Sequence, residues 1–186
     1  MPARIVSTRT AHHGWTQLLV ATVRLETGDE VRREIEHHGD AVAVLPYDPE
    51  RRVALLVRQL RAPALFAGGP PLLLEVPAGQ LDESDPEACA RREAHEEVGL
   101  RLGELEFVAA PFASPGISTE RISLYLAPYR AADRVAEGGG DASEEIIVAE
   151  TPLAELAGLL GRGAVTDLKT VALVQALQLR RPDLFA

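Results

Sequence analysis

The sequence predicts an α/β fold in which a mixed sheet lies between two layers of helices, preceded by an antiparallel hairpin. Short apolar or alternating segments bounded by turn residues recur from residue 15 to residue 149 and indicate strands. One well delimited helix interrupts these strands, and the C-terminal tail has a helical pattern. Helices on both faces of one sheet bury its two apolar surfaces, which predicts an α/β/α sandwich.

The expected elements follow one another along the chain. Residues 15–37 read as a hairpin with a turn at E-T-G-D-E, because their apolar positions partly alternate. Residues 41–47 and 53–60 form a second pair around D-P-E-R-R, where Pro49 presets a turn dihedral. We also expect strands at 72–76, 106–110, 122–129 and 146–149, and helices at 151–160 and from Thr170 onward.

Size and charge narrow the class of protein. A chain of 186 residues with 46% hydrophobic content is long enough for a substantial core. The net charge of -9 argues against nonspecific binding of nucleic acid or anionic membranes. No apolar run approaches the ~20 residues of a membrane span, and residues 1–10 lack the apolar core of a signal peptide. We therefore expect a cytoplasmic protein that binds neither nucleic acid nor membranes.

The most informative stretch is a loop that becomes a helix before residue 100. Ser84 or Asp85 can cap this helix through a side-chain oxygen, and Pro86 suits its first turn. Gly99 suits the left-handed position just past its end. The helix is therefore predicted to be short, with both ends marked in the sequence.

Three carboxylates share one side of this helix. Residues four apart stack, so Glu93 and Glu97 point the same way, and Glu96 lies near both. Like charges at this spacing repel, and a hard divalent cation such as Mg2+ would neutralise them. The alternative is a solvated acidic face with Arg91 and Arg92 as ion-pair partners.

The stretch R-E-A-H-E-E-V-G-L at residues 92–100 matches the R-E-U-x-E-E-x-G-U core of the Nudix box, in which U is aliphatic. Gly79 also matches the glycine upstream of that core. The chain therefore resembles the Nudix hydrolase superfamily. The resemblance implies a Nudix-type α/β/α sandwich whose loop-helix-loop binds divalent metals. It also implies a pyrophosphohydrolase that acts on phosphoric anhydrides in nucleoside diphosphates linked to another moiety.

The resemblance assigns roles by position. Glu93 and Glu97 correspond to metal ligands, with Glu96 in or near the ligand shell, and the backbone carbonyl of Ala78 to a further ligand. Arg92 corresponds to a residue that orients the glutamates. The implied cofactor is Mg2+, with Mn2+ as an alternative.

The box departs from the usual pattern by one residue. The family places a glutamate six residues after the glycine; here Asp85 occupies that distance, with Glu83 and Ser84 nearby. The shortened form L-D-x-x-D-P-E-x-C resembles the bacterial GDP-mannose hydrolase group within the superfamily. The departure therefore favours a nucleoside diphosphate sugar as substrate.

Further residues are candidates for binding this substrate. Arg58 and Arg61 lie in V-R-Q-L-R-A-P, where the related groups have an R-Q-x-R stretch that contacts phosphate or sugar. The alternative for each arginine is a surface ion pair. Trp15 is a candidate for stacking on the base, with a place in the core as the equal alternative. Ser114, Pro115 and Gly116 form a turn that resembles both the ADP-ribose pyrophosphatase and GDP-mannose hydrolase groups.

Residues 138–146 read as a mobile, acidic, glycine-rich loop. In related enzymes a loop glutamate completes the metal site or activates water, and by position Glu144 is the first choice and Glu145 the second. The alternative is a disordered, solvated loop.

These observations lead to one functional hypothesis. We expect Mg2+-dependent hydrolysis of GDP-mannose to GMP and mannose 1-phosphate, with ADP-ribose as the alternative substrate. A ligand-binding regulator without turnover is the alternative from another class. Residues 1–38 are expected to form a strand extension that dimerises the protein, by resemblance to the ADP-ribose and GDP-mannose hydrolases, and residues 39–186 the hydrolase domain.

Overall fold

The computed structural model of the chain describes residues 1–82, 85–140 and 145–186. It divides into two compact units. Unit 1 comprises Met1–Asp40 and Pro111–Ile122, and unit 2 comprises Ala41–Ala110 and Ser123–Ala186. Unit 1 thus combines the N-terminal strands with a segment from the middle of the chain. A division at residue 38 into extension and hydrolase domain stays a prediction.

Unit 1 contains a three-stranded antiparallel sheet in the order β1-β2-β3. The predicted hairpin is confirmed as β2 (Gln17–Arg24) and β3 (Glu30–His37), and Gly28 at the turn between them has a φ of 95°. The sequence did not predict β1 (Arg4–His13). Every residue of β1 is exposed, and a strand without a buried face has no apolar alternation to reveal it.

The second segment of unit 1 lies along β3. Ser118 forms a parallel bridge with Glu36, whose backbone N–H donates to the Ile117 carbonyl over 2.8 Å. His37 Nδ1 and Thr119 Oγ1 are 2.8 Å apart and form a hydrogen bond. The segment that contains the predicted S-P-G turn is thereby fixed to the N-terminal sheet.

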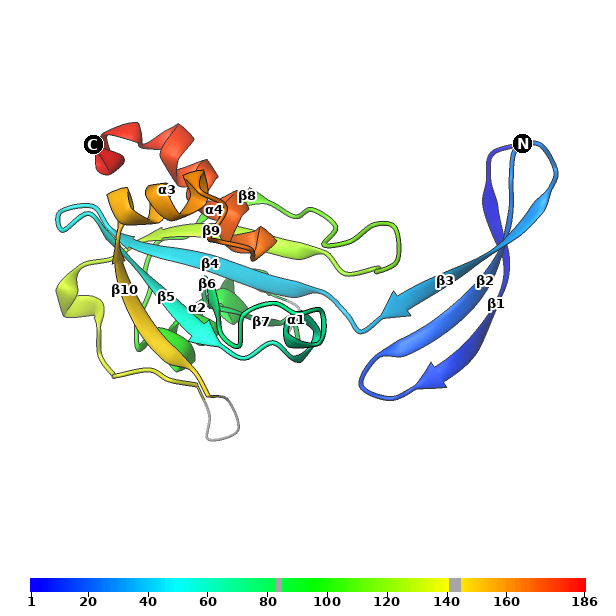
Figure 1. Ribbon diagram of the computed structural model, residues 1–186, viewed down its shortest axis with the longest axis horizontal. Coiled ribbons are helices and arrows are strands. Elements are labelled where there is room, and N and C mark those ends of the chain that lie inside the picture. The colour runs from blue at the N-terminus through cyan, green and yellow to red at the C-terminus, as the bar shows by residue number, and fades with distance from the viewer. Residues whose placement is uncertain (83–84, 141–144) are drawn as a thin grey trace. The chain divides into compact units, whose positions relative to one another are not determined.

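Unit 2 is built around a second sheet in the order β10-β5-β4-β9-β8, with β6 beside β5 and β7 beside β4. Figure 1 shows β4 and β9 running in the same direction, whereas β5 is antiparallel to both β4 and β10. The sheet is therefore mixed, as predicted. Its strands are β4 (Ala41–Asp48), β5 (Val53–Gln59), β6 (Leu73–Glu75), β7 (Ala78–Gln80), β8 (Glu106–Ala109), β9 (Ile122–Pro128) and β10 (Ile147–Pro152).

Helices cover both faces of this sheet, which confirms the α/β/α sandwich (Figure 1). α2 (Pro86–Val98) lies on one face, while α3 (Leu153–Gly161) and α4 (Leu168–Arg180) lie on the other. The remaining helical segments are α1 (Ala62–Phe66), η1 (Ala131–Asp133) and η2 (Pro182–Phe185). The sequence did not predict α1 or β7, because elements of three to five residues are too short to show a periodic pattern.

The central strands β4 and β5 are buried on both sides. Val42, Val44, Leu55 and Val57 belong to the core cluster that includes α2. Successive side chains of a strand point to opposite faces of the sheet. The fully buried residues that alternate with these four, such as Leu45 and Leu56, therefore face α3 and α4. Each buried side chain of this size contributes about 1.5–3 kcal/mol relative to an exposed one. This two-sided core fixes the sheet face on which α2 packs and thereby holds the helix that carries the glutamates.

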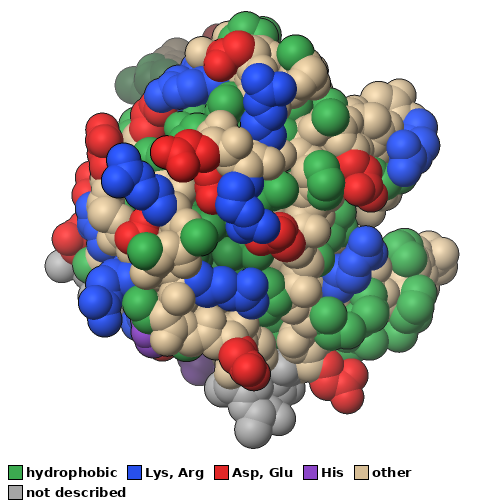
Figure 2. Space-filling view, turned by 90° about the vertical axis from the view of Figure 1, so that its left-hand side faces the viewer, with side chains coloured by type: hydrophobic (Ala, Val, Ile, Leu, Met, Phe, Trp, Pro, Cys, Tyr) green, Lys and Arg blue, Asp and Glu red, His purple; other side chains and the backbone are tan. Residues whose placement is uncertain are grey.

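Acidic and basic side chains are interspersed on the face shown in Figure 2, rather than separated into large patches of one sign. Exposed ion pairs include Arg51 with Glu150 and Arg180 with Glu106. Such pairs contribute about 0–1 kcal/mol each and say little about function. In the part of the chain that the structure describes, no helix is long and apolar enough to cross a membrane.

Candidate active site

The ends of α2 are fixed as its sequence predicts. Asp85 is the N-cap, and its side chain accepts the Glu87 N–H over 2.9 Å. Pro86 is the first helical residue, and Gly99 ends the helix in the left-handed region with a φ of 71°. Asp85, which occupies the place of the family's glutamate, is thus used as a cap. The other candidate cap, Ser84, lies outside the described residues, as does Glu83.

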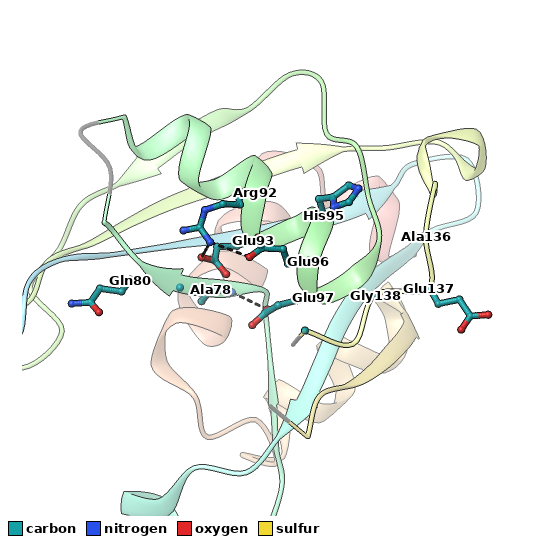
Figure 3. Close-up of a pocket in the computed structure, with 12 residues that line it drawn as sticks. Ala78, Gln80, Arg92, Glu93, His95, Glu96, Glu97, Ala136, Glu137 and Gly138 are labelled. Atoms are coloured by element: carbon teal, nitrogen blue, oxygen red, sulfur yellow. Dashed lines mark hydrogen bonds and ion pairs between the residues drawn. The ribbon is translucent and has the colours of Figure 1, made fainter. Parts of the chain in front are cut away.

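The three glutamates of α2 line one cleft of about 660 Å³, shown in Figure 3. Glu93 and Glu97 are buried, at 8% and 4% exposure, whereas the side chain of Glu96 is 50% exposed. The helical spacing therefore brings together the three carboxylates that the sequence singled out. The wall of the cleft consists of Ala78, Gly79, Gln80, Arg92, Glu93, His95, Glu96, Glu97, Ala136, Glu137, Gly138 and Gly140.

Arg92 is the cation shared by the acidic groups of this cleft. Its Nη1 atom lies 2.9 Å from Glu93 Oε1 and 3.0 Å from Glu96 Oε2, and its Nη2 atom lies 3.0 Å from Asp82 Oδ1. Burial lowers the pKa of Arg92, but the surrounding acidic groups, Glu93 foremost, outweigh that effect and raise it. Arg92 therefore stays charged and fixes the direction of the carboxylates, which is the role implied by the resemblance.

The strand β7 contacts the glutamates through its backbone. The Ala78 N–H donates to Glu97 Oε2 over 3.1 Å. A Cβ atom on residue 79 would overlap the carboxylate of Glu93, so only glycine leaves room for that side chain. The expected role of the Ala78 carbonyl as a metal ligand stays a prediction.

The glycine segment 138–140 is docked on the C-terminal end of α2. Gly139 N–H donates to the Glu97 carbonyl over 2.8 Å, and Gly140 N–H donates to the Glu96 carbonyl over 3.0 Å. All three glycines have positive φ angles, and a Cβ on Gly138 would overlap the α2 backbone. The first part of the predicted loop thus serves as a backbone cap for the helix, while its mobility stays a prediction.

The donor set of the cleft suits a hard divalent cation. Arg92 pairs with three carboxylates, so the cleft retains surplus negative charge, and carboxylate oxygens are the ligands that Mg2+ prefers. Within the described residues, no three acidic, histidine or cysteine side chains already converge in the geometry of a metal site. Glu93 is turned toward Arg92, and Glu97 toward the Ala78 amide. Each of these contacts uses one carboxylate oxygen, and the other oxygen of each group is a possible ligand.

Arg61 lies in a charged network that the sequence did not predict. Its Nε and Nη2 atoms form two hydrogen bonds with Glu75, of 2.9 and 3.0 Å, and Glu75 also pairs with Lys169. Arg61 is not among the residues that line the cleft, and neither is Arg58, which is exposed within β5. The available signals were a glutamate inside the apolar run L-L-L-E-V and the single lysine of the chain.

The remaining candidates for substrate binding belong to unit 1. Trp15 is 75% exposed, so the core alternative for this residue is wrong, and its ring stacks on His38 with centroids 4.9 Å apart. Ser114, Pro115 and Gly116 form the predicted turn, in which the Ser114 carbonyl accepts backbone N–H groups from residues 117 and 118.

The candidates for a loop base fall near the start of β10. Glu145 is exposed and precedes this strand by two residues. Glu144 lies outside the described residues. The structure therefore brings Glu93, Glu96 and Glu97 together in one cleft, while the contribution of a loop glutamate stays a prediction.

The chain is similar in sequence to a known domain family and to named bacterial proteins. A model of the NUDIX domain matches residues 37–174. A GDP-mannose pyrophosphatase from Cronobacter sakazakii is 44% identical over 156 residues, covering 82% of this chain and 82% of that protein. A GDP-mannose pyrophosphatase from Klebsiella pneumoniae is 34% identical over 179 residues, covering 94% of this chain and 90% of that protein.

A similar fold is found among solved structures. The crystal structure of an ADP compounds hydrolase matches 97% of this chain and 96% of its own, with a TM-score of 0.76 and 19% sequence identity. At this identity the likeness shows the fold alone. The match to the domain model, which spans the α2 glutamates, together with the identity to the two bacterial proteins, establishes that the chain belongs to the Nudix family.

Proposed function

We propose that this protein hydrolyses the pyrophosphate bond of GDP-mannose, giving GMP and mannose 1-phosphate, with Mg2+ as cofactor. The observation that carries the proposal is the cleft with Glu93 and Glu97 buried in its wall beside the more exposed Glu96. Burying like charges together is unfavourable unless a cation neutralises them. A regulator that only binds a ligand has less need of this arrangement, so an enzyme is favoured.

Different residues of the chain would bind the cation and accept the proton of the attacking water. Glu93 and Glu97, with the Ala78 carbonyl, would hold the cation, and Glu96 would lie in or near its shell. When bound, Mg2+ supplies positive charge that offsets the pyrophosphate and acidifies water. Mn2+ would serve in the same place. Glu144, or Glu145 after it, would accept the proton of the attacking water.

Substrate binding is proposed for groups outside the carboxylate cluster. Arg61, and Arg58 beside it in sequence, would contribute positive charge to the phosphates. Trp15, which exposes most of its ring, would stack on the guanine base. The turn formed by Ser114, Pro115 and Gly116 would contact the nucleotide sugar through exposed backbone groups.

Guanine is favoured over adenine for two reasons. The shortened Nudix box resembles that of the GDP-mannose hydrolase group, and the two bacterial relatives are named GDP-mannose pyrophosphatases. A site whose buried groups pair with the guanine carbonyl and amine would leave them unpaired with adenine, at about 1–3 kcal/mol each. ADP-ribose is the competing substrate.

We also infer that the enzyme works in the cytoplasm as a homodimer.

A panel of nucleoside diphosphate sugars tests the proposal. With Mg2+ present, GDP-mannose should give a kcat/KM at least about tenfold above that of ADP-ribose, with GMP and mannose 1-phosphate as products. Excess chelator should abolish turnover, and added Mg2+ should restore it. Full activity in excess chelator would exclude the metal mechanism. A tenfold preference for ADP-ribose would show that ADP-ribose, and not GDP-mannose, is the substrate.

A further inference from the structure

Four charged side chains of unit 2, Arg61, Glu75, Lys169 and Asp167, form a linked network, and none of them belongs to the Nudix box. Glu75 is 1% exposed and pairs with both Arg61 and Lys169. Lys169 Nζ is also 2.8 Å from Asp167 Oδ1. The side chains of Lys169 and Asp167 are 12% and 14% exposed. Two cations and two anions thus neutralise each other, and of the four side chains only Arg61 is substantially exposed, at 40%.

The network joins the start of α4 to the strand that leads into the cleft. Asp167 caps α4 by accepting the Thr170 N–H over 3.0 Å, and Thr170 Oγ1 accepts the Val76 N–H over 2.8 Å. Val76 follows Glu75 directly, and the Ala78 N–H two residues later donates to Glu97. The network therefore holds residues 75–78 in place, and Ala78 in this segment contacts the carboxylate of Glu97, which we assign to the metal.

Arg61 has unused hydrogen-bond donors. Its Nε and Nη2 atoms bond to Glu75, and among the residues that the structure describes Nη1 has no partner. Its side chain is 40% exposed. Burial lowers the pKa of Arg61, but the hydrogen bond and charge of Glu75, followed by the charge of Glu97, raise it overall. Arg61 thus senses the charge of Glu97, although it does not line the cleft, and one edge of its guanidinium remains available.

A buried ion-pair network contributes little to stability compared with apolar residues of similar volume. We infer that the network instead orients the guanidinium of Arg61. The arginine side chain is flexible, and its planar group forms two parallel hydrogen bonds with a phosphate only in a defined orientation. We propose that Lys169 is a positioning residue, which shares Glu75 with Arg61 and so fixes the Nη1 edge of Arg61 toward a phosphate of the substrate. The inference rests on the proposed function, since it assumes that Arg61 binds the pyrophosphate.

A double-mutant cycle tests this proposal. Arg61→Gln removes the phosphate contact, and Lys169→Met removes the second cation on Glu75 while keeping a side chain of similar length. Each should raise KM for GDP-mannose at least about fivefold and leave kcat within about twofold, because a phosphate contact acts on ground and transition states alike. The double variant should match Arg61→Gln within about twofold, since Lys169 acts through Arg61.

Arg180→Met is the matched control. Arg180 lies at the other end of the same helix and pairs with Glu106 at 2.7 Å. Its KM should stay within about twofold of wild type. If Lys169→Met does not fold, Lys169→Gln, which is polar but also lacks the positive charge, replaces it in the cycle.

Binding of inorganic pyrophosphate tests the role of Lys169 independently of which nucleotide sugar is the substrate. The affinity for inorganic pyrophosphate with Mg2+, measured by calorimetry, should fall in the same non-additive way, whatever nucleotide sugar is hydrolysed. Effects of the two variants that multiply would overturn the proposal, as would a Lys169→Met protein with lowered Tm but wild-type KM and pyrophosphate affinity. A wild-type protein that fails to bind pyrophosphate would also overturn it.

Discussion

At the scale of single residues, Glu97 combines burial with a fixed hydrogen bond to the Ala78 amide. We expect Glu97→Gln to lower kcat for GDP-mannose at least ~100-fold, because the amide keeps an acceptor for Ala78 but loses the charge that holds a cation. The fold should persist, as judged by circular dichroism. Steady-state kinetics at saturating Mg2+ measure the loss.

Glu87→Gln is the control for this variant. Glu87 lies on the same helix and pairs with Arg91 at 3.1 Å, with 49% of its side chain exposed. Its kcat should stay within about twofold of wild type. Wild-type turnover by the Glu97→Gln protein would remove Glu97 from the mechanism.

Gly79 provides a second test, because it leaves space that the Glu93 carboxylate fills. Gly79→Ala should displace this carboxylate and lower kcat/KM at least about tenfold, since small misplacements of catalytic groups are costly. Gly103→Ala is the comparison: a Cβ there meets nothing within 4 Å. Equal kcat/KM values for the two variants would show that the position of Glu93 does not matter.

Residues close in sequence could be predicted well, and residues brought together by the fold could not. Helical spacing suffices to place Glu93 and Glu97 on one side, and cap chemistry suffices for Asp85. The pair of Glu75 and Lys169 joins β6 to α4 across the fold, and no local pattern records that contact. The resemblance, and not physical reasoning, supplied the roles of the glutamates.

At the scale of elements, the contact between β6 and α4 should control stability at low pH. Burial raises the pKa of Glu75, but Arg61 and Lys169 outweigh it and hold the pKa below its usual value of 4.5. The unfolded chain then binds the proton more readily than the folded one. The stabilisation is therefore fully present above pH 4.5 and is lost as the pH falls through the lower pKa of the folded state.

Glu75→Gln should remove this dependence. Between about pH 5 and 3 the free energy of unfolding should fall less steeply for the variant than for wild type, as measured by denaturant titration. At pH 7 the variant should be less stable, because Arg61 and Lys169 lose their shared anion. Parallel pH profiles for the two proteins would mean that Glu75 keeps its usual pKa.

Elements could be predicted when their ends or buried faces leave a signal. The helix α2 has both ends marked by Asp85, Pro86 and Gly99, and β4 is a continuous apolar run. The strand β1 has neither, since its side chains are exposed and its content is mixed. The mixed sheet and its two helical layers followed from the order of elements, because layered packing admits few alternatives.

At the scale of the whole molecule, unit 1 has very little buried core of its own. Among its residues, all of which the structure describes, only Ala21 is fully buried. Apolar side chains of β2 and β3 stay half-buried, so part of the apolar surface of this sheet remains in contact with water. We therefore expect the chain to dimerise through unit 1.

Light scattering after gel filtration checks this expectation. The species in solution at micromolar concentration should have about twice the chain mass of 20.0 kDa. The mass should remain unchanged on moderate dilution, because an interface that completes a core is obligate. A species of one chain mass across the concentration series would exclude the dimer.

The docking of residues 138–140 on α2 has a consequence for how this protein can diversify. The Val135 N–H donates to the Gly99 carbonyl over 2.9 Å, and Gly139 returns to Glu97, so the chain leaves the helix and comes back to the same point. The chain between Gly99 and Val135 includes the strands β8 and β9 as well as the segment with Ser114. The connection between these two strands lies outside the sheet of unit 2, and lengthening a flexible loop costs only about 0.6 kcal/mol for each doubling. We expect insertions and deletions in that connection to leave the register of α2 unchanged.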